Sequence, residues 1–221
     1  MNHTVLLLAL LACAAFSPRD KNRPFDCGFY VSDSSQVHSV YRKTLQYIET
    51  APGERIASIG AQNGIFEVEL SFFRPGIVWT VQDINPRCLN EVEFGKVKRY
   101  YEELMSRKLA DSFSLVLGTE DSTRLASGAY DRVLLLNTYH ELSDKATVLR
   151  EIHRVLRAGG RLVVMERMAS KPGKIRKDCG HLMPLEGDLL ADLERAGFRN
   201  VNKSVTHDRW PRTFYTFERA D

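Results

Sequence analysis

The chain has 221 residues, of which 43% are hydrophobic and 27% charged, and its formal net charge is +3. These values are ordinary for a soluble globular protein, and the length suits one large domain. The charge is mild and its signs are interspersed, so we expect no nucleic-acid partner. No two cysteines have C-x-x-C spacing, so we expect no metal site. Cys27, Cys88 and Cys179 leave room for at most one disulfide, whose pairing stays open.

Residues 1–16 read MNHTVLLLALLACAAF and contain an apolar run that is too short to span a bilayer comfortably. The run suits the hydrophobic region of a secretory signal. The segment from Leu10 to Cys13 resembles a bacterial lipobox, which would imply attachment to the membrane through a lipid on Cys13. We therefore expect a signal peptide or lipoprotein leader and a location in the cell envelope. The alternative is a cytoplasmic protein with an apolar leader.

The next segment, residues 17–35, is polar and contains Pro18, Pro24 and Gly28. We expect it to be a linker or a loosely packed arm. Residues 36–221 are expected to form the folded domain. Its first helix is predicted by helical spacing of apolar residues from Val37 to Ile48.

The segment RIASIGAQNGIFEVEL, residues 55–70, predicts a strand, a tight turn and a helix. Gly60 and Gly64 bracket the turn, where they allow a positive φ and let a ligand approach the backbone. The helix that follows offers free N–H groups at its N-terminus. Such a turn opens the nucleotide pocket in doubly wound α/β folds, although plain strand-to-helix turns share the G-x-x-x-G spacing.

A second strand at residues 77–81 ends next to Asp83, which lies 19 residues after Gly64. A doubly wound nucleotide fold places an acid there to accept from the ribose hydroxyls. Alternatively, Asp83 caps the helical stretch predicted from residue 85, which continues to about residue 108 with a possible break at Gly95.

The rest of the chain continues the alternation of strands and helices. Strands are predicted at residues 113–117, 130–136, 161–166, 198–206 and 212–218, with helices at 143–158 and 185–195. Ser143 is the predicted cap of the first of these helices, and Gly159 and Gly160 are predicted to stop it. The pattern predicts an α/β fold with a doubly wound, mostly parallel, seven-stranded Rossmann-like sheet and a C-terminal antiparallel hairpin strand.

The order of these elements resembles the class I S-adenosylmethionine-dependent methyltransferases over residues 37–218. Three segments carry the resemblance: IASIGAQNG at residues 56–64, Asp83 after the second strand, and YDRVLLLNTYHEL with LREIHRVLRAGGRLVVMER at residues 130–167. The resemblance implies S-adenosylmethionine as cofactor. It places Gly60, Ala61 and Gly64 along the methionine part, Asp83 on the ribose, Ile84 on the adenine, Glu120 and Asp121 near the adenine amino group, and Asn137 toward the methyl-transfer site.

Two positions depart from the family's usual pattern. Ser58 stands where the family usually has an acid, and Gln62 stands where it usually has a third glycine. The acid often helps to hold the cofactor's amino group. Losing one charge-assisted hydrogen bond would lower affinity by about 10- to 150-fold.

A sulfonium methyl is already activated, so the enzyme needs to align a nucleophile and, where that nucleophile carries a proton, to supply a base. His140, three residues after the fourth strand, is the candidate base; alternatively it buttresses or caps the next helix. Tyr139 is expected to line the pocket or pack against the arm, and His181 to be solvated. We do not expect Cys179 to act as a nucleophile, because the sequence shows no partner for its thiol. Residues 17–40 and 171–184 are expected to cover the pocket.

The sequence therefore predicts an S-adenosylmethionine-dependent methyltransferase with an altered cofactor loop. The acceptor is a small molecule or a protein group that the residues do not specify. The alternative is a non-catalytic binding protein of the cell envelope that keeps the methyltransferase fold.

Overall fold

A computed structural model of the chain describes residues 24–206 and 211–220. The expected leader with Cys13, the first part of the arm and the tip of the last hairpin lie outside the described residues. The helices are α1 (Ser34–Ile48), α2 (Ile65–Ser71), α3 (Glu91–Leu104), α4 (Lys145–Val155) and α5 (Glu186–Arg195), with a 3-10 turn at Tyr139–Glu141. The strands are β1 (Arg55–Ile59), β2 (Val78–Asp83), β3 (Ser112–Leu117), β4 (Tyr130–Leu136), β5 (Leu156–Glu166), β6 (Phe198–Val205) and β7 (Thr213–Arg219).

The seven strands form one sheet in the order β3-β2-β1-β4-β5-β7-β6. Neighbours from β3 to β5 are parallel, whereas β7 is antiparallel to both β5 and β6. Strand β7 therefore runs antiparallel to the other six strands, as expected from the predicted C-terminal hairpin. The predicted α/β fold class is confirmed.

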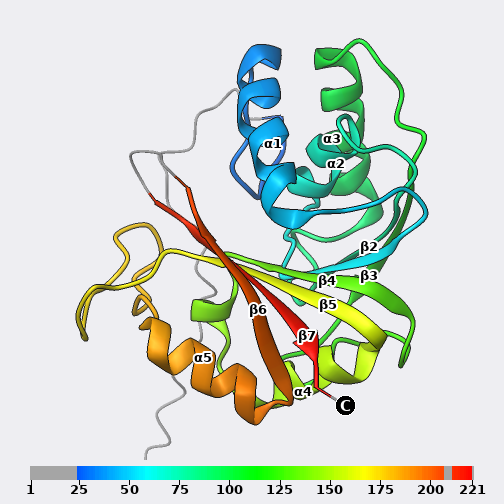
Figure 1. Cartoon of the computed structure of the whole chain (residues 1–221). Helices are drawn as coiled ribbons and strands as arrows, with labels where there is room; N and C mark the ends of the chain where they lie inside the picture. Colours follow the sequence, from blue (N-terminus) through cyan, green and yellow to red (C-terminus); the bar gives the residue numbers. More distant parts are fainter. Residues whose placement is uncertain (1–23, 207–210, 221) are drawn as a thin grey trace, which may run out of the picture.

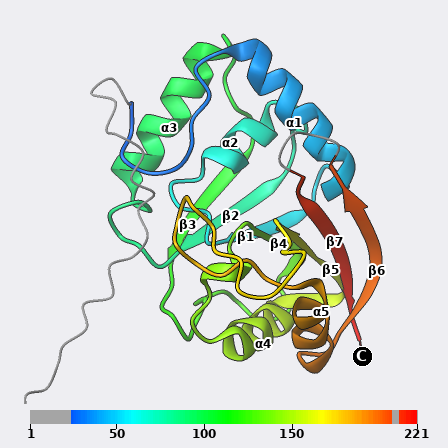
Figure 2. The ribbon, with the colours of Figure 1, turned by 90° about the vertical axis from the view of Figure 1, so that its left-hand side faces the viewer.

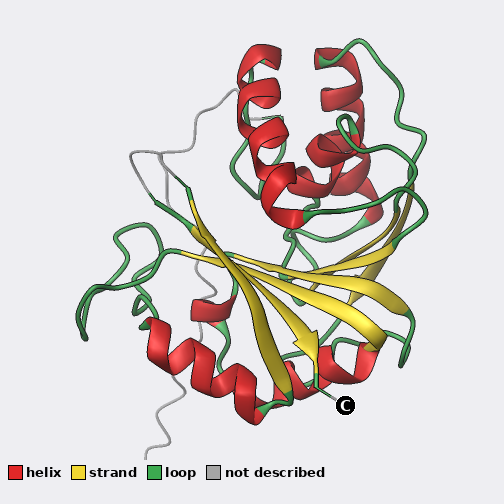
Figure 3. Ribbon diagram, in the orientation of Figure 1, coloured by secondary structure: helices red, strands yellow, loops and turns green. Residues whose placement is uncertain are grey.

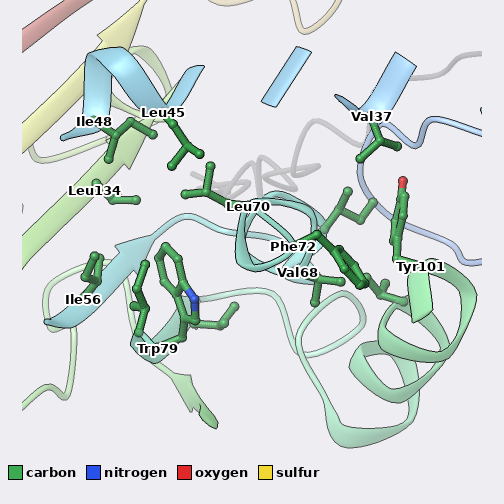
Figure 4. Packing of buried hydrophobic residues seen from close by; sticks show 14 of the residues in the cluster. Val37, Leu45, Ile48, Ile56, Val68, Leu70, Phe72, Trp79, Tyr101 and Leu134 are labelled. Carbon is green, nitrogen blue, oxygen red and sulfur yellow. The ribbon is translucent and has the colours of Figure 1, made fainter. Parts of the chain in front are cut away.

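Helices cover both faces of the sheet (Figures 1 and 3). Helices α1, α2 and α3 lie on one face, and α4 and α5 lie on the other. The side chains of β4 alternate accordingly: Leu134 packs with the first group, while Val133 and Leu135 pack with the second. Figure 4 shows the first of these cores, in which α1 and α2 residues meet the sheet near Trp79.

Two helix starts differ from the prediction. Helix α3 begins at Glu91 because Asn90 caps it, its side chain accepting from the N–H groups of the second and third helical residues. Asp83 is therefore not the cap, and the helix continues through Gly95 without a break. Helix α4 is capped by Asp144, not Ser143, because Asp144 Oδ1 accepts from the N–H of Thr147 at 3.0 Å.

The end of α4 also differs. The helix stops at Val155 and β5 starts at Leu156, so Gly159 and Gly160 lie inside the strand. The pairing of β4 with β5 shifts register here, which is the irregularity of a bulge. Gly159 has φ +70°, so a glycine suits this strand irregularity rather than a helix stop.

Residues 24–33 of the expected loose arm are packed against the domain. Phe25 is only 2% exposed, and its ring makes edge contacts with Tyr30 and Tyr100. A disulfide joins Cys27 to Cys88 across 61 residues. Aromatic burial and a covalent link thus hold this segment where its polar composition suggested freedom. No helix in the described part of the chain is long and apolar enough to cross a membrane.

Candidate functional site

The predicted site residues gather at one edge of the sheet, where β1, β2, β3 and β4 end. The strand order reverses between β1 and β4, and the helices that follow these two strands lie on opposite faces. Such a switch point is where open α/β sheets bind ligands, because the two diverging connections leave room between them. Figure 2 views the fold from this side, with residues 167–185 crossing in front of the strand ends.

The turn between β1 and α2 uses left-handed backbone at three positions. Gly60, Gln62 and Gly64 have φ values of +71°, +53° and +76°. A Cβ on Gly60 would clash with the side chain of Thr138. Gln62 also has a positive φ, and glycine adopts such a conformation at lower cost than other residues. Glycine would therefore suit position 62. The neighbouring Ala61 N–H donates to the Gln82 carbonyl at 3.0 Å and fastens the turn to the end of β2.

Asp83 connects the end of β2 to this turn. Its side chain is buried, with Oδ2 accepting from the Gln62 N–H at 2.7 Å and Oδ1 from the Asn85 N–H at 2.8 Å. Burial raises the pKa of Asp83 above its ordinary value, against the lowering effect of these hydrogen bonds. Each carboxylate oxygen keeps a lone pair for another donor. The next residue, Ile84, is 49% exposed and offers an apolar surface beside the carboxylate.

A buried acid lies next to Ser58 although the strand itself has none there. Ser58 is buried on the side of β1 that faces α2, and Glu67 of α2 is only 1% exposed. Burial raises the pKa of Glu67 to about 7, while a hydrogen bond from Ser58 lowers it and the charge of Asp83 raises it further. Glu67 Oε2 has no hydrogen-bond partner among the described residues. A buried carboxyl group of α2 thus lies beside Ser58, which the sequence analysis missed.

Glu120 and Asp121 follow β3 and are exposed at the same edge. Asp121 Oδ1 accepts from the Thr119 hydroxyl at 2.6 Å. The Gly118 N–H donates to the Asp83 carbonyl at 2.9 Å, so this loop starts directly beside Asp83. The predicted cofactor residues of β1, β2 and β3 are therefore neighbours.

Asn137 ends β4 with φ +59° and is covered by the loop after β5. Its Oδ1 accepts from Arg176 Nη1 at 2.5 Å, and the Arg176 guanidinium also pairs with Asp178. The pairing lowers the pKa of Asp178 to about 2. Arg176 thus ties residues 171–184 to the strand ends, where this loop was expected to cover the pocket.

His140 is held by a buried carboxylate. Its side chain is fully buried, and Nδ1 lies 2.9 and 3.1 Å from the two carboxylate oxygens of Glu166. The backbone N–H of His140 also donates to Glu166 Oε1 at 3.2 Å. Glu166 thereby favours the tautomer with a proton on Nδ1 and leaves Nε2 as the acceptor nitrogen. His140 precedes α4 and does not cap it.

Three side chains differ from expectation around His140. Cys179 Sγ lies 3.5 Å from His140 Nε2, so Cys179 does have a partner, 39 residues away in sequence. The half-buried His181 places its ring centroid 6.0 Å from that of His140, rather than standing alone in solvent. Tyr139 donates to Asp192 of α5 at 2.5 Å and packs in the second core, whereas the buried residues of the arm pack in the first.

Comparison with known proteins finds similarity to methyltransferases. A family profile described as "Methyltransferase domain" matches residues 75–164. The ubiquinone/menaquinone biosynthesis C-methyltransferase UbiE of Vibrio parahaemolyticus is 26% identical over 181 residues, covering 78% of this chain and 65% of the relative. UbiE of Geotalea uraniireducens is 27% identical over 126 residues, covering 57% of this chain and 50% of the relative. The chain thus spans half to just under two thirds of these relatives.

Solved structures share the architecture. A methyltransferase from Methanosarcina mazei aligns with a TM-score of 0.64 at 15% identity, covering 82% of this chain and 98% of that one. Magnesium protoporphyrin IX methyltransferase from Synechocystis, solved with bound S-adenosylhomocysteine, aligns with a TM-score of 0.57 at 17% identity, covering 84% and 83%. At these identities the structures establish the fold alone. Residues 75–164 thus match a methyltransferase domain, and the chain shares its fold with S-adenosylmethionine-dependent methyltransferases.

Proposed function

We propose that the protein transfers a methyl group from S-adenosylmethionine to an acceptor held beneath residues 171–184. The observation that carries the proposal is the buried Asp83 carboxylate bound to the glycine turn at the switch point of the sheet. This arrangement brings a hydroxyl-binding acid and left-handed backbone together at one edge. The cofactor would supply the activated methyl group.

The residues present fit such a cofactor. Gly60, Ala61 and Gly64 would lie along its methionine part, Asp83 would accept from the ribose hydroxyls, Ile84 would pack on the adenine, and Glu120 and Asp121 would lie near the adenine amino group. Glu67 would take the role of the acid that the family usually has at position 58. Its buried carboxyl lies beside Ser58, and one of its oxygens has no partner among the described residues. A cationic amino group nearby would favour ionisation of this carboxyl.

His140 is proposed as the group that removes the acceptor's proton. Its Nε2 is the acceptor nitrogen, because Glu166 occupies Nδ1. The Glu166 carboxylate would also stabilise the imidazolium that forms, as a buried negative charge does for a histidine base. Asn137 and Arg176 would position the loop that excludes water from this side.

The curated relatives act in ubiquinone and menaquinone biosynthesis by C-methylation, as their names state. We therefore test quinol and phenol acceptors first, with thiols and amines alongside, by following transfer of a labelled methyl group. Wild-type protein should label at least one acceptor class. His140→Gln should lower kcat while leaving cofactor binding intact, and Asp83→Ala should weaken cofactor binding. Labelling that is unchanged in both variants would refute the assigned site.

The Cys27–Cys88 disulfide supports folding in an oxidising compartment, since such bonds persist there and are rare in reducing cytosol. We propose that location for the protein. Alkylation of free thiols before reduction, followed by mass spectrometry on protein from its own cells, should find Cys27 and Cys88 protected. Envelope attachment through Cys13 and a non-catalytic binding role stay predictions. Cofactor binding without transfer to any acceptor would favour the non-catalytic role.

A further inference from the structure

Three potential metal-ligand atoms meet beside the strand ends. His140 Nε2, a Glu141 carboxylate oxygen and Cys179 Sγ all lie within 4.8 Å of one another. Nε2 is 3.5 Å from Glu141 Oε1 and 3.5 Å from Cys179 Sγ. The sequence analysis did not predict this group, because it considered only C-x-x-C spacing. Cys179 lies 39 residues after His140 in the sequence.

The two separations from the imidazole suit a tetrahedral ion, and the Glu141 oxygen and Cys179 Sγ lie within 4.8 Å of each other. Zinc binds histidine nitrogen at about 2.0–2.1 Å, carboxylate oxygen at about 2.0–2.2 Å and thiolate sulfur at about 2.3 Å. At tetrahedral angles these bond lengths separate nitrogen from oxygen by about 3.4 Å and nitrogen from sulfur by about 3.5 Å. Both measured separations from Nε2 are 3.5 Å. An ion could therefore enter with little movement of the imidazole.

The surroundings also suit a cation. Glu166 holds His140 through Nδ1, which is the carboxylate contact that orients metal-bound histidines. The nearby Arg176 guanidinium is already paired with Asp178. One imidazole, one carboxylate and one thiolate would neutralise a divalent charge.

We propose that His140, Glu141 and Cys179 form a three-ligand site for a divalent cation of the zinc type. Mixed nitrogen, sulfur and oxygen ligands favour such an ion over magnesium or calcium. Three protein ligands leave a fourth tetrahedral position for water or for an acceptor hydroxyl or thiol. Metal binding at this site does not depend on the proposed function; only the binding of an acceptor to the ion does. With an ion bound, Nε2 would be its ligand, and the ion would take over the role proposed above for His140 by lowering the pKa of the acceptor group. In metal-free protein His140 would keep that role.

The test uses the full chain with its disulfide intact and with Cys13→Ser, so that Cys13 supplies no thiol. Equilibrium dialysis measures Zn²⁺ binding, and Co²⁺ substitution reports a thiolate ligand through its charge-transfer absorption. One ion per chain is expected. Cys179→Ser should abolish the charge-transfer band, and His140→Gln should weaken binding by more than about 100-fold. Glu166→Gln should weaken it by about 10- to 100-fold while preserving the band.

His38→Gln is the matched control, because His38 lies on α1, packs against Phe73 and is not part of the His140 cluster. Its Zn²⁺ affinity should equal that of wild type. Circular dichroism establishes that each variant is folded. Folded wild-type protein that binds no Zn²⁺, or Co²⁺ binding that Cys179→Ser leaves unchanged, would overturn the proposal. Cofactor titration of the same metal-free samples separates this failure from failure of the methyltransferase assignment.

Discussion

Glu67→Gln should make the protein more stable at alkaline pH. Burial raises the pKa of Glu67 from 4.5 to about 7, so the native state favours the neutral acid. At about 1.36 kcal/mol for each pKa unit, ionising this group above pH 7 costs the native state about 3 kcal/mol. Glutamine has nearly the shape of the neutral acid and never ionises. It therefore removes that cost.

The sign follows from proton binding. Between pH 4.5 and 7 the native state holds the Glu67 proton and the unfolded state has lost it. The stability that this group contributes is complete below pH 4.5 and is lost as the pH rises through about 7. The variant and wild type should thus be similar at pH 4.5, and the variant should gain up to about 3 kcal/mol by pH 8.

Urea unfolding at a series of pH values measures this difference. Subtracting the wild-type free energy from that of Glu67→Gln cancels the other titrating groups. Glu120→Gln, a change of an exposed acid, is the matched control and should give a flat difference. A flat difference for Glu67→Gln as well would refute the reasoning that burial keeps this acid protonated in the native state.

Three further predictions concern the turn and the covering segments. Reducing the Cys27–Cys88 bond, which spans 61 residues, should lower the free energy of unfolding by about 4 kcal/mol, measured in urea with and without reductant; an unchanged midpoint would contradict this. Gly60→Ala, at φ +71°, should cost about 1–3 kcal/mol and weaken cofactor binding, and wild-type values in calorimetry would count against a rigid turn. Arg176→Gln should speed hydrogen exchange in residues 171–184, whereas equal exchange would show that other contacts hold the loop.

Apolar runs made most strands predictable. The bounds of β4 match the prediction at both ends, because YDRVLLL is apolar enough to be buried on both faces. Helix starts were less predictable, since several polar residues compete to cap the same helix. Asn90 and Asp144 succeed because their side chains reach the free N–H groups, which spacing alone does not reveal.

The site was predictable where it follows strand ends and unpredictable where distant segments meet. Asp83 and the glycine turn come together because parallel strands end at one edge. The burial of Glu67 was not predictable, because an acid on a short helix is usually exposed. Only the fold shows that this side chain is buried against Ser58. The contact of His140 with Cys179 depends on how a long loop folds back, and no local pattern encodes it.

Calorimetric titration with S-adenosylmethionine, with thermal unfolding alongside, tests most directly whether the proposed residues form a working cofactor site. We predict binding with a dissociation constant on the order of micromolar, and stabilisation of about 2.7 kcal/mol at 100 times that concentration. Asp83→Ala should abolish both signals while the protein stays folded. Folded wild-type protein that gives no heat and no stabilisation at millimolar cofactor would contradict the account.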